Sequence, residues 1–235
     1  MIPKKIHYCW FGKNPLPKEV IKCIDSWKKW CPDYEIIEWN ESNYDLDKNE
    51  YVRETYSRKK WAFLTDYVRL DVIYNEGGIY LDTDVELIKP IDDLLNLECF
   101  LGMEQPGKVA TGLGFGAVKG NEFIKENKEY YEKNSFISAD GEFKKVICVE
   151  ITSNLLINKG MKVSNTLQDI GKIRVFPTEY FCPLKLGTNK LNITKNTYSI
   201  HHYTASWKSN NKLIRKIGYY LIPLKQFIKK MVKKI

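Results

Sequence analysis

The first 40 residues alternate between segments with two different hydrophobic periods. Residues 5–11 form a short apolar and aromatic run that ends at Gly12, which predicts a buried strand. Residues 17–30 place four apolar side chains at the spacing of an amphipathic helix, and residues 34–39 then alternate like a second strand. This strand, helix, strand order predicts an α/β fold with a mainly parallel central sheet.

The next segment brings an acidic motif to the edge of that sheet. The apolar residues of 51–74 suit one or two amphipathic helices, which end at the sequence NEGG of residues 75–78. Residues 79–81 then predict a short strand, directly followed by Asp82, Thr83 and Asp84. We therefore expect both aspartates at the carboxyl edge of the sheet, where open α/β sheets bind ligands.

The second half of the chain predicts further helices and strands around a glycine-rich loop. That loop, residues 104–116, contains no Lys-Ser or Lys-Thr pair typical of a phosphate-binding loop. We interpret it as a wall of an acceptor pocket, with Glu104 or Gln105 facing the pocket. The other predicted elements are helices at 91–97, 121–133 and 141–158, and strands at 99–103, 175–177 and 198–202.

Charge divides the chain into two parts. The formal net charge is +8, but residues 208–235 hold nine Lys or Arg and no acid, so residues 1–207 carry −1. A nearly neutral body argues against a nucleic-acid partner. We predict one domain over residues 1–207 and a basic amphipathic helix over residues 208–235. This helix either docks on the domain or lies on an anionic membrane surface.

The sequence also indicates a compartment. The first residues lack a signal-peptide pattern, and no uncharged stretch approaches the roughly 20 residues that cross a bilayer. The six cysteines are scattered without a C-x-x-C pair, which indicates neither a zinc site nor a dense disulfide framework. We expect a cytoplasmic protein, with peripheral attachment to the inner face of the plasma membrane as a further hypothesis.

Asp82 and Asp84 are the strongest candidates for chemistry. In an extended segment, side chains at i and i+2 point to the same side of the backbone, so both carboxylates face one cation. Mn²⁺ or Mg²⁺ is commonly held by one or two carboxylates while substrate phosphates complete its shell. A diphosphate leaving group needs such charge neutralisation as its bond to a sugar breaks. The alternative is a structural pair of acids in a surface turn.

Two charged residues on an otherwise apolar helix lie shortly before this pair. Asp66 and Arg69 are spaced i and i+3, so they share one helix face. One interpretation is a local salt bridge. The other places Asp66 on a hydroxyl of a sugar donor and Arg69 on its diphosphate or sugar, because a guanidinium offers a fork of donors.

Four segments resemble the glycosyltransferases of family 32, which carry a sugar-binding Asp-x-Asp region. Residues 62–69 read AFLTDYVR, residues 77–85 read GGIYLDTDV, residues 2–12 read IPKKIHYCWFG, and residues 200–207 read IHHYTASW. The resemblance implies a GT-A type fold, a nucleotide-sugar donor and a retaining reaction. It also implies catalytic roles for Asp82, Asp84, Asp66 and Arg69.

The same resemblance suggests how a donor and a metal are held. It implies that Trp10 stacks on the base and that one of the paired histidines completes the metal shell. Because His201 and His202 face opposite ways on a strand, only one reaches the metal, and we favour His201 with Asp82 and Asp84. The full set of predicted donor-binding residues is Trp10, Asp66, Arg69, Tyr80, Asp82, Ser206 and Trp207.

From these patterns we predict a metal-dependent glycosyltransferase. It moves a hexose from a nucleotide sugar, a UDP-sugar by resemblance, to a saccharide or lipid-linked saccharide acceptor in surface polysaccharide synthesis. Two alternatives use the same features differently. One is a metal-dependent nucleotide-sugar hydrolase without an acceptor pocket, and the other is a non-enzymatic membrane-binding module in which the aspartates are structural.

Overall fold

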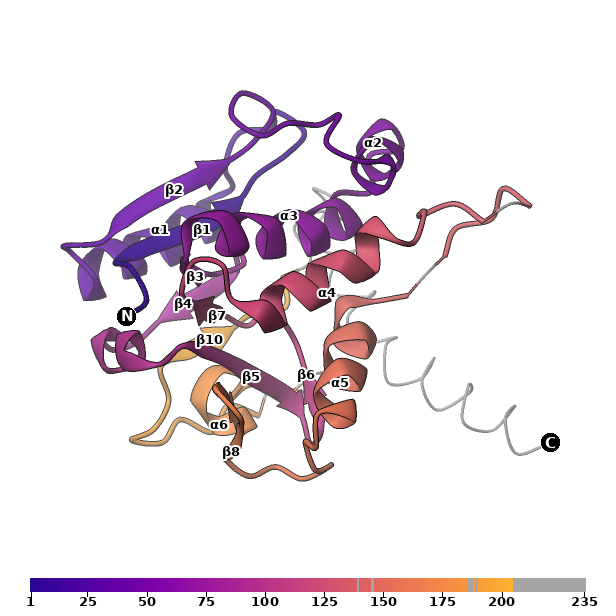
Figure 1. The fold of residues 1–235 in the computed structure, drawn as a ribbon. Helices are drawn as coiled ribbons and strands as arrows, with labels where there is room; N and C mark the ends of the chain where they lie inside the picture. Colours follow the sequence, from indigo (N-terminus) through magenta and orange to yellow (C-terminus); the bar gives the residue numbers. More distant parts are fainter. Residues whose placement is uncertain (139, 145, 186–187, 189, 205–235) are drawn as a thin grey trace.

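A computed structural model describes residues 1–138, 140–144, 146–185, 188 and 190–204. Over these residues an eight-stranded sheet has the order β2-β1-β3-β7-β5-β9-β8, with β6 paired to β5 (Figure 1). Its strands are β1 (Lys5–Cys9), β2 (Glu35–Trp39), β3 (Gly78–Tyr80), β5 (Cys99–Gln105), β6 (Lys108–Val109), β7 (Phe115–Ala117), β8 (Gln168–Ile170) and β9 (Ile173–Phe176). A separate two-stranded sheet pairs β4 (Val85–Leu87) with β10 (Ser199–His201).

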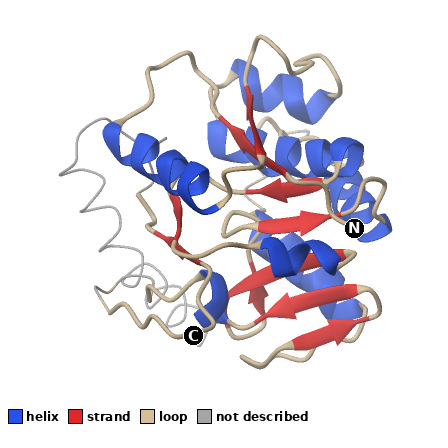
Figure 2. Ribbon diagram, turned by 90° about the vertical axis from the view of Figure 1, so that its left-hand side faces the viewer, coloured by secondary structure: helices blue, strands red, loops and turns tan. Residues whose placement is uncertain are grey.

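The helices of the described residues lie on both sides of the strands (Figure 2). They are α1 (Lys18–Trp30), α2 (Glu50–Ser57), α3 (Trp61–Glu76), α4 (Glu122–Glu132), α5 (Cys148–Asn158) and α6 (Thr178–Phe181), with the 3-10 helix η1 (Asp92–Asn96). None of these helices is long and apolar enough to cross a membrane.

The strand directions confirm an α/β fold with a mostly parallel central sheet. β2 and β3 run parallel to β1, and β9 runs parallel to β5. Strand β7 lies between β3 and β5 and is antiparallel to both, so β1, β2, β3, β5 and β9 all point the same way. The carboxyl ends of β1, β2 and β3 therefore meet at one edge, as the sequence order predicted.

Strand alternation divides the interior into two cores. Along β3, Tyr80 packs with the core that contains Leu64 and Tyr67 of α3, whereas Ile79 packs with the core that contains Trp27 of α1. This follows from the period of two, which sends successive side chains to opposite faces of a sheet. Leu81 packs in the core on the α1 side of the sheet, so Asp82 lies on the α3 side, near Arg69.

Helix α3 and strand β3 are joined by two glycines that the backbone requires. Gly77 ends the helix at φ 67°, and its N–H donates to the carbonyl of Ile73. Gly78 follows at φ 109°, and a β-carbon there would lie 2.9 Å from both the Lys5 carbonyl oxygen and the ring of His7. The pair stops the helix and lets the chain enter the sheet beside β1, as the sequence predicted.

The glycine-rich segment 104–116 differs from its predicted loop because it contains β6 and β7. Strand β7 reads Phe-Gly-Ala, which carries little intrinsic strand preference, and pairing with β3 and β5 places it in the sheet. A β-carbon at Gly116 would lie 2.5 Å from the ring of Phe100, so this position admits only glycine without rearrangement.

Two other predicted elements change. The helix expected over 141–158 begins only at Cys148, because Phe143 pairs with Ile137 in an isolated antiparallel bridge. The predicted C-terminal helix over 208–235 and the boundary at residue 207 lie outside the described residues. They stay predictions.

His7 is a buried structural histidine in β1. Its Nδ1 accepts from the indole N–H of Trp39 at 3.0 Å, which leaves Nε2 as the donor to the Gly77 carbonyl at 2.9 Å. The ring is therefore neutral, and burial lowers the pKa of His7 from 6.5 to about 4.

This neutral ring predicts acid sensitivity. Below pH 6.5 the unfolded chain binds a proton at His7 that the folded protein excludes until about pH 4. As pH falls from 7 to 4, we expect the free energy of unfolding to drop by up to about 3 kcal/mol relative to that of His7→Gln. Urea unfolding of both proteins across this range measures the difference, and parallel pH profiles would contradict the prediction.

Candidate functional site

The two aspartates of the Asp-x-Asp motif lie in a turn between β3 and β4. The Val85 N–H donates to the Asp82 carbonyl at 3.0 Å, which closes the turn. The expectation of an extended segment at these residues is therefore wrong. The turn nevertheless brings ligand atoms of Asp82, Asp84 and His201 within 4.8 Å of one another.

The small β4–β10 sheet delivers the histidine. His201 lies opposite Val85 in this antiparallel pair, and its Nε2 is 3.1 Å from Asp84 Oδ1. His202 turns away and contacts Glu86 Oε2 at 2.8 Å. Of the two histidines, His201 is thus the one that reaches the aspartates, and its role as a metal ligand stays a prediction.

Asp84 is held ionised by its neighbours. The Thr204 N–H and hydroxyl donate to Asp84 Oδ2 at 2.8 and 3.3 Å. Burial alone would raise the pKa of Asp84, but His201 and these hydrogen bonds outweigh it and bring the pKa to about 2. The same ion pair raises the pKa of His201 against the opposing effect of burial. Sequence reasoning had not assigned Thr204, although it lies inside the matched run 200–207.

Arg69 lies on the other side of the pair, held between two carboxylates. Its Nη2 is 3.2 Å from Asp82 Oδ1 and 3.3 Å from Asp66 Oδ1, and only 5% of its side chain is exposed. The Thr65 carbonyl accepts from Arg69 Nε at 2.9 Å, which fixes the plane of the guanidinium. The spacing of i and i+3 gives the salt bridge to Asp66, and the fold adds the contact to Asp82.

Asp66 is nearly buried, with 8% of the residue exposed. Burial, opposed by Arg69 and reinforced by the charge of Asp82, raises the pKa of Asp66 to about 6. Cys148, at the start of α5, is close enough to act in the opposite direction and lower this pKa.

The site carries uncompensated negative charge. Asp66, Asp82 and Asp84 supply three negative charges, while Arg69 supplies one positive charge, which leaves −2 when His201 is neutral. Burial raises the pKa of Asp82, as expected for a carboxylate that gains from a further cation. Two carboxylates and one imidazole fit a divalent cation such as Mn²⁺ or Mg²⁺, and a ligating imidazole must first lose its proton.

The glycine-rich segment closes over this pair. A β-carbon at Gly112 would lie 2.3 Å from Asp82 Oδ2 and 3.0 Å from Arg69 Nη1. The backbone at Gly112 therefore lies against the Arg69–Asp82 contact, and the Thr111 hydroxyl lies 3.5 Å from Arg69 Nη1. The sequence-based interpretation placed this loop at an acceptor pocket, and the structure places it against the candidate metal site.

The structure describes two of the other predicted donor-binding residues, Tyr80 and Trp10. The Tyr80 hydroxyl donates to Asp82 Oδ1 at 3.1 Å, and the ring of Tyr80 lies 5.0 Å from the Arg69 guanidinium carbon. Trp10 follows β1 at the same sheet edge and donates from its indole N–H to the Asn14 carbonyl at 2.6 Å. Base stacking by Trp10 stays a prediction, and Ser206 and Trp207 lie outside the described residues.

Glu104 lies at the carboxyl end of β5, which points to the same edge as β1 and β3. Burial raises its pKa, and the nearby His201 acts in the opposite direction. Glu104, which we predicted to face the acceptor, is therefore close enough to His201 for their charges to interact. Its role in the acceptor pocket stays a prediction.

The described residues form an α/β fold of the GT-A type, with a carboxylate and imidazole cluster at the sheet edge. Residues 17–101 match the family model described as "Glycosyltransferase sugar-binding region containing DXD motif". The chain is therefore similar to the DXD-containing region of this family over residues 17–101, and the resemblance found in the sequence is confirmed.

Individual proteins are similar over different shares of the chain. Inositol phosphoceramide mannosyltransferase 3 of Schizosaccharomyces pombe is 30% identical over 52% of this chain and 35% of its own length. The chain thus spans about a third of that fungal relative. Uncharacterized glycosyltransferase L373 of Acanthamoeba polyphaga mimivirus is 26% identical over 92% of this chain and 87% of its own.

A solved structure supports the fold. The PaToxG glycosyltransferase superposes with a TM-score of 0.54 at 20% sequence identity, over 68% of this chain and 70% of its own. At this identity the likeness concerns the arrangement of helices and strands.

The close approach of Gly112 predicts a loss of metal affinity in Gly112→Ala. The new methyl group must displace Asp82 or Arg69. We expect Mn²⁺ affinity, followed by the paramagnetic resonance of free Mn²⁺, to fall by about tenfold or more. Gly116→Ala is the matched control, because its methyl group meets the Phe100 ring at 2.5 Å in the core. It should lower the melting temperature and leave Mn²⁺ affinity unchanged; equal affinities in all three proteins would refute the prediction.

Proposed function

We propose that this protein is a metal-dependent glycosyltransferase that moves a hexose from a nucleotide sugar to a saccharide or lipid-linked saccharide acceptor. The resemblance to family 32 favours a UDP-sugar donor, a retaining reaction and a place in surface polysaccharide synthesis. The observation that carries the proposal is the convergence of Asp82, Asp84 and His201 within 4.8 Å at the sheet edge, beside Arg69.

The chain's own groups suit a donor whose diphosphate carries two negative charges in the nucleotide sugar and gains a further one as the bond to the sugar breaks. A divalent cation held by Asp82, Asp84 and His201 would neutralise the diphosphate charge. Arg69 is fixed before the donor arrives, since Asp66, Asp82 and Thr65 hold its guanidinium. A donor group that takes one of these hydrogen bonds meets a pre-oriented cation, which stabilises developing charge without reorganisation.

Asp66 is proposed to bind a hydroxyl of the donor sugar. Its carboxyl group is nearly buried and lies 3.3 Å from Arg69 Nη2, so its position is well determined. A sugar hydroxyl that donates to the remaining lone pairs would be held in one orientation relative to the diphosphate. Such positioning is a main source of rate when the acceptor hydroxyl must meet the anomeric carbon.

Nucleotide binding is the first test. We expect Mn²⁺ together with UDP or GDP to raise the melting temperature, since a ligand at about 100 times its Kd stabilises a protein by about 2.7 kcal/mol. Asp84→Asn should abolish the metal-dependent part. Asp169→Asn, which breaks only the exposed pair with Arg174, should respond like the natural protein. Absence of any metal-dependent response to both nucleotides would remove the proposed donor site.

The fate of the donor sugar distinguishes a nucleotide-sugar hydrolase from a glycosyltransferase. With a labelled UDP-sugar, a transferase should release free sugar slowly and transfer it faster when a saccharide acceptor is added. Release at full rate that acceptors do not change would favour the nucleotide-sugar hydrolase.

We further propose that residues 208–235 attach the protein to the inner face of the plasma membrane, which would bring a lipid-linked acceptor to the site. The charge pattern alone motivates this, at about 1 kcal/mol for each basic residue near an anionic surface. Replacing Lys229, Lys230, Lys233 and Lys234 with glutamine should release the full chain from phosphatidylserine vesicles. The same change at Lys28 and Lys29 should leave vesicle binding unaltered, and retention of the tail variant on vesicles would refute attachment.

A further inference from the structure

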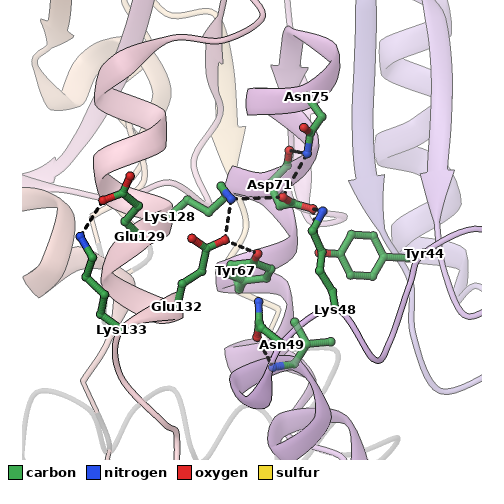
Figure 3. Close-up of polar contacts among 11 residues, drawn as sticks. Tyr44, Lys48, Asn49, Tyr67, Asp71, Asn75, Lys128, Glu129, Glu132 and Lys133 are labelled. Atoms are coloured by element: carbon green, nitrogen blue, oxygen red, sulfur yellow. Dashed lines mark hydrogen bonds and ion pairs between the residues drawn. The ribbon is translucent and has the colours of Figure 1, made fainter.

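A second charged cluster lies on the opposite face of α3 from Asp66 and Arg69. Its centre is Asp71, whose side chain is only 3% exposed. Lys48 Nζ donates to Asp71 Oδ2 at 2.6 Å and the Tyr44 hydroxyl donates to the same oxygen at 2.9 Å. Asn75 donates to Asp71 Oδ1 at 3.0 Å (Figure 3). A buried carboxylate with so many donors holds its neighbours in defined positions.

Asp71 joins two separate parts of the molecule to α3. From one side comes α4, whose Lys128 lies 3.6 Å from Asp71 Oδ1 and also pairs with Glu132 (Figure 3). From the other side come Tyr44 and Lys48, in the loop of residues 40–49 that follows β2. The two lysines thus connect one carboxylate to different elements.

The loop of residues 40–49 in turn holds the segment that follows β1. The Gly12 N–H donates to Glu41 Oε1 at 2.7 Å. The Tyr44 ring packs edge-on against Phe11, with centroids 6.3 Å apart. Residues 10–12 therefore take their position from this loop.

These same residues lie where a nucleotide is expected. β1 and β3 are parallel neighbours, with His7 opposite Tyr80, so residues 10–12 and Asp82 follow adjacent strands at one carboxyl edge. Ligands of open α/β sheets bind in the crevice outside such strand ends. The segment after β1 is thus the natural flank for the part of the donor remote from the metal.

We propose that Asp71, acting through Lys48 and Tyr44, is a positioning residue for the nucleotide of the donor. One contact path runs from α3 to the 40–49 loop and on to residues 10–12, while the opposite face of α3 carries Asp66 and Arg69. One helix therefore sets the distance between the nucleotide flank and the diphosphate site. This inference rests on the proposed donor function.

The two lysines provide a matched pair of variants. Lys48→Met removes one of the two contacts between the loop and Asp71, which keeps Lys128, Tyr44 and Asn75, so the carboxylate stays paired. Lys128→Met removes a cation from the same carboxylate on the α4 side and leaves the loop contacts in place. Tyr44→Phe removes one hydrogen bond and keeps the ring that packs on Phe11.

The test measures the Kd of UDP and of GDP at saturating Mn²⁺ by calorimetry, with the melting temperature of each protein. We expect Lys48→Met to raise the Kd of the bound nucleotide by about threefold to tenfold, with a smaller rise in Tyr44→Phe. Lys48→Arg should restore the natural Kd. Lys128→Met should lower the melting temperature and leave the Kd unchanged.

Two results would overturn the inference alone while the natural protein still binds nucleotide. One is an unchanged Kd in Lys48→Met, and the other is a Kd that rises in Lys48→Met and Lys128→Met in proportion to their lost stability. Failure of the natural protein to bind UDP or GDP with Mn²⁺ would instead overturn the donor function and this inference together.

Discussion

The site depends on one buried guanidinium shared by two carboxylates. Arg69 lies 3.2 Å from Asp82 and 3.3 Å from Asp66, with 5% of its side chain exposed. A buried charge is costly to leave unpaired, so each of these groups constrains the positions of the others. Because Asp66 and Arg69 belong to α3 and Asp82 follows β3, the interaction also fixes the helix against the sheet.

The surrounding backbone is adapted to this ion pair. Gly77 and Gly78 let α3 end and β3 begin within one turn, so that Asp82 emerges beside the helix that carries Arg69. Gly112 lets a third segment close over the pair, since any β-carbon there would meet Asp82 at 2.3 Å. Absence of a side chain at these glycines is therefore as much a part of the site as the charged groups.

The second charged cluster shows how α3 connects distant segments. Its two opposite faces carry Arg69 toward the aspartates and Asp71 toward the 40–49 loop and α4. Residues 66–73 of α3 are all buried, and such a helix transmits position rigidly because close-packed interiors resist small displacements. In the donor complex that we propose, the same helix organises both the diphosphate end and the nucleotide end of the donor.

The local sequence pattern was enough to predict the α/β class, the sheet edge at which Asp82 and Asp84 lie, and the shared helix face of Asp66 and Arg69. These features could be predicted because the hydrophobic periods of 2 and 3.6 residues and the Gly-Gly turn are encoded within short segments. The alternation of side-chain directions along a strand also predicted that only one of His201 and His202 reaches the aspartates. Only the tertiary structure decided that a turn, rather than an extended strand, brings the aspartates to His201. It also decided that β7 enters the sheet despite its glycine, and that Thr204 and Gly112 lie against the charged groups. These are contacts between segments far apart in sequence, and neither spacing nor propensity records which distant surfaces meet.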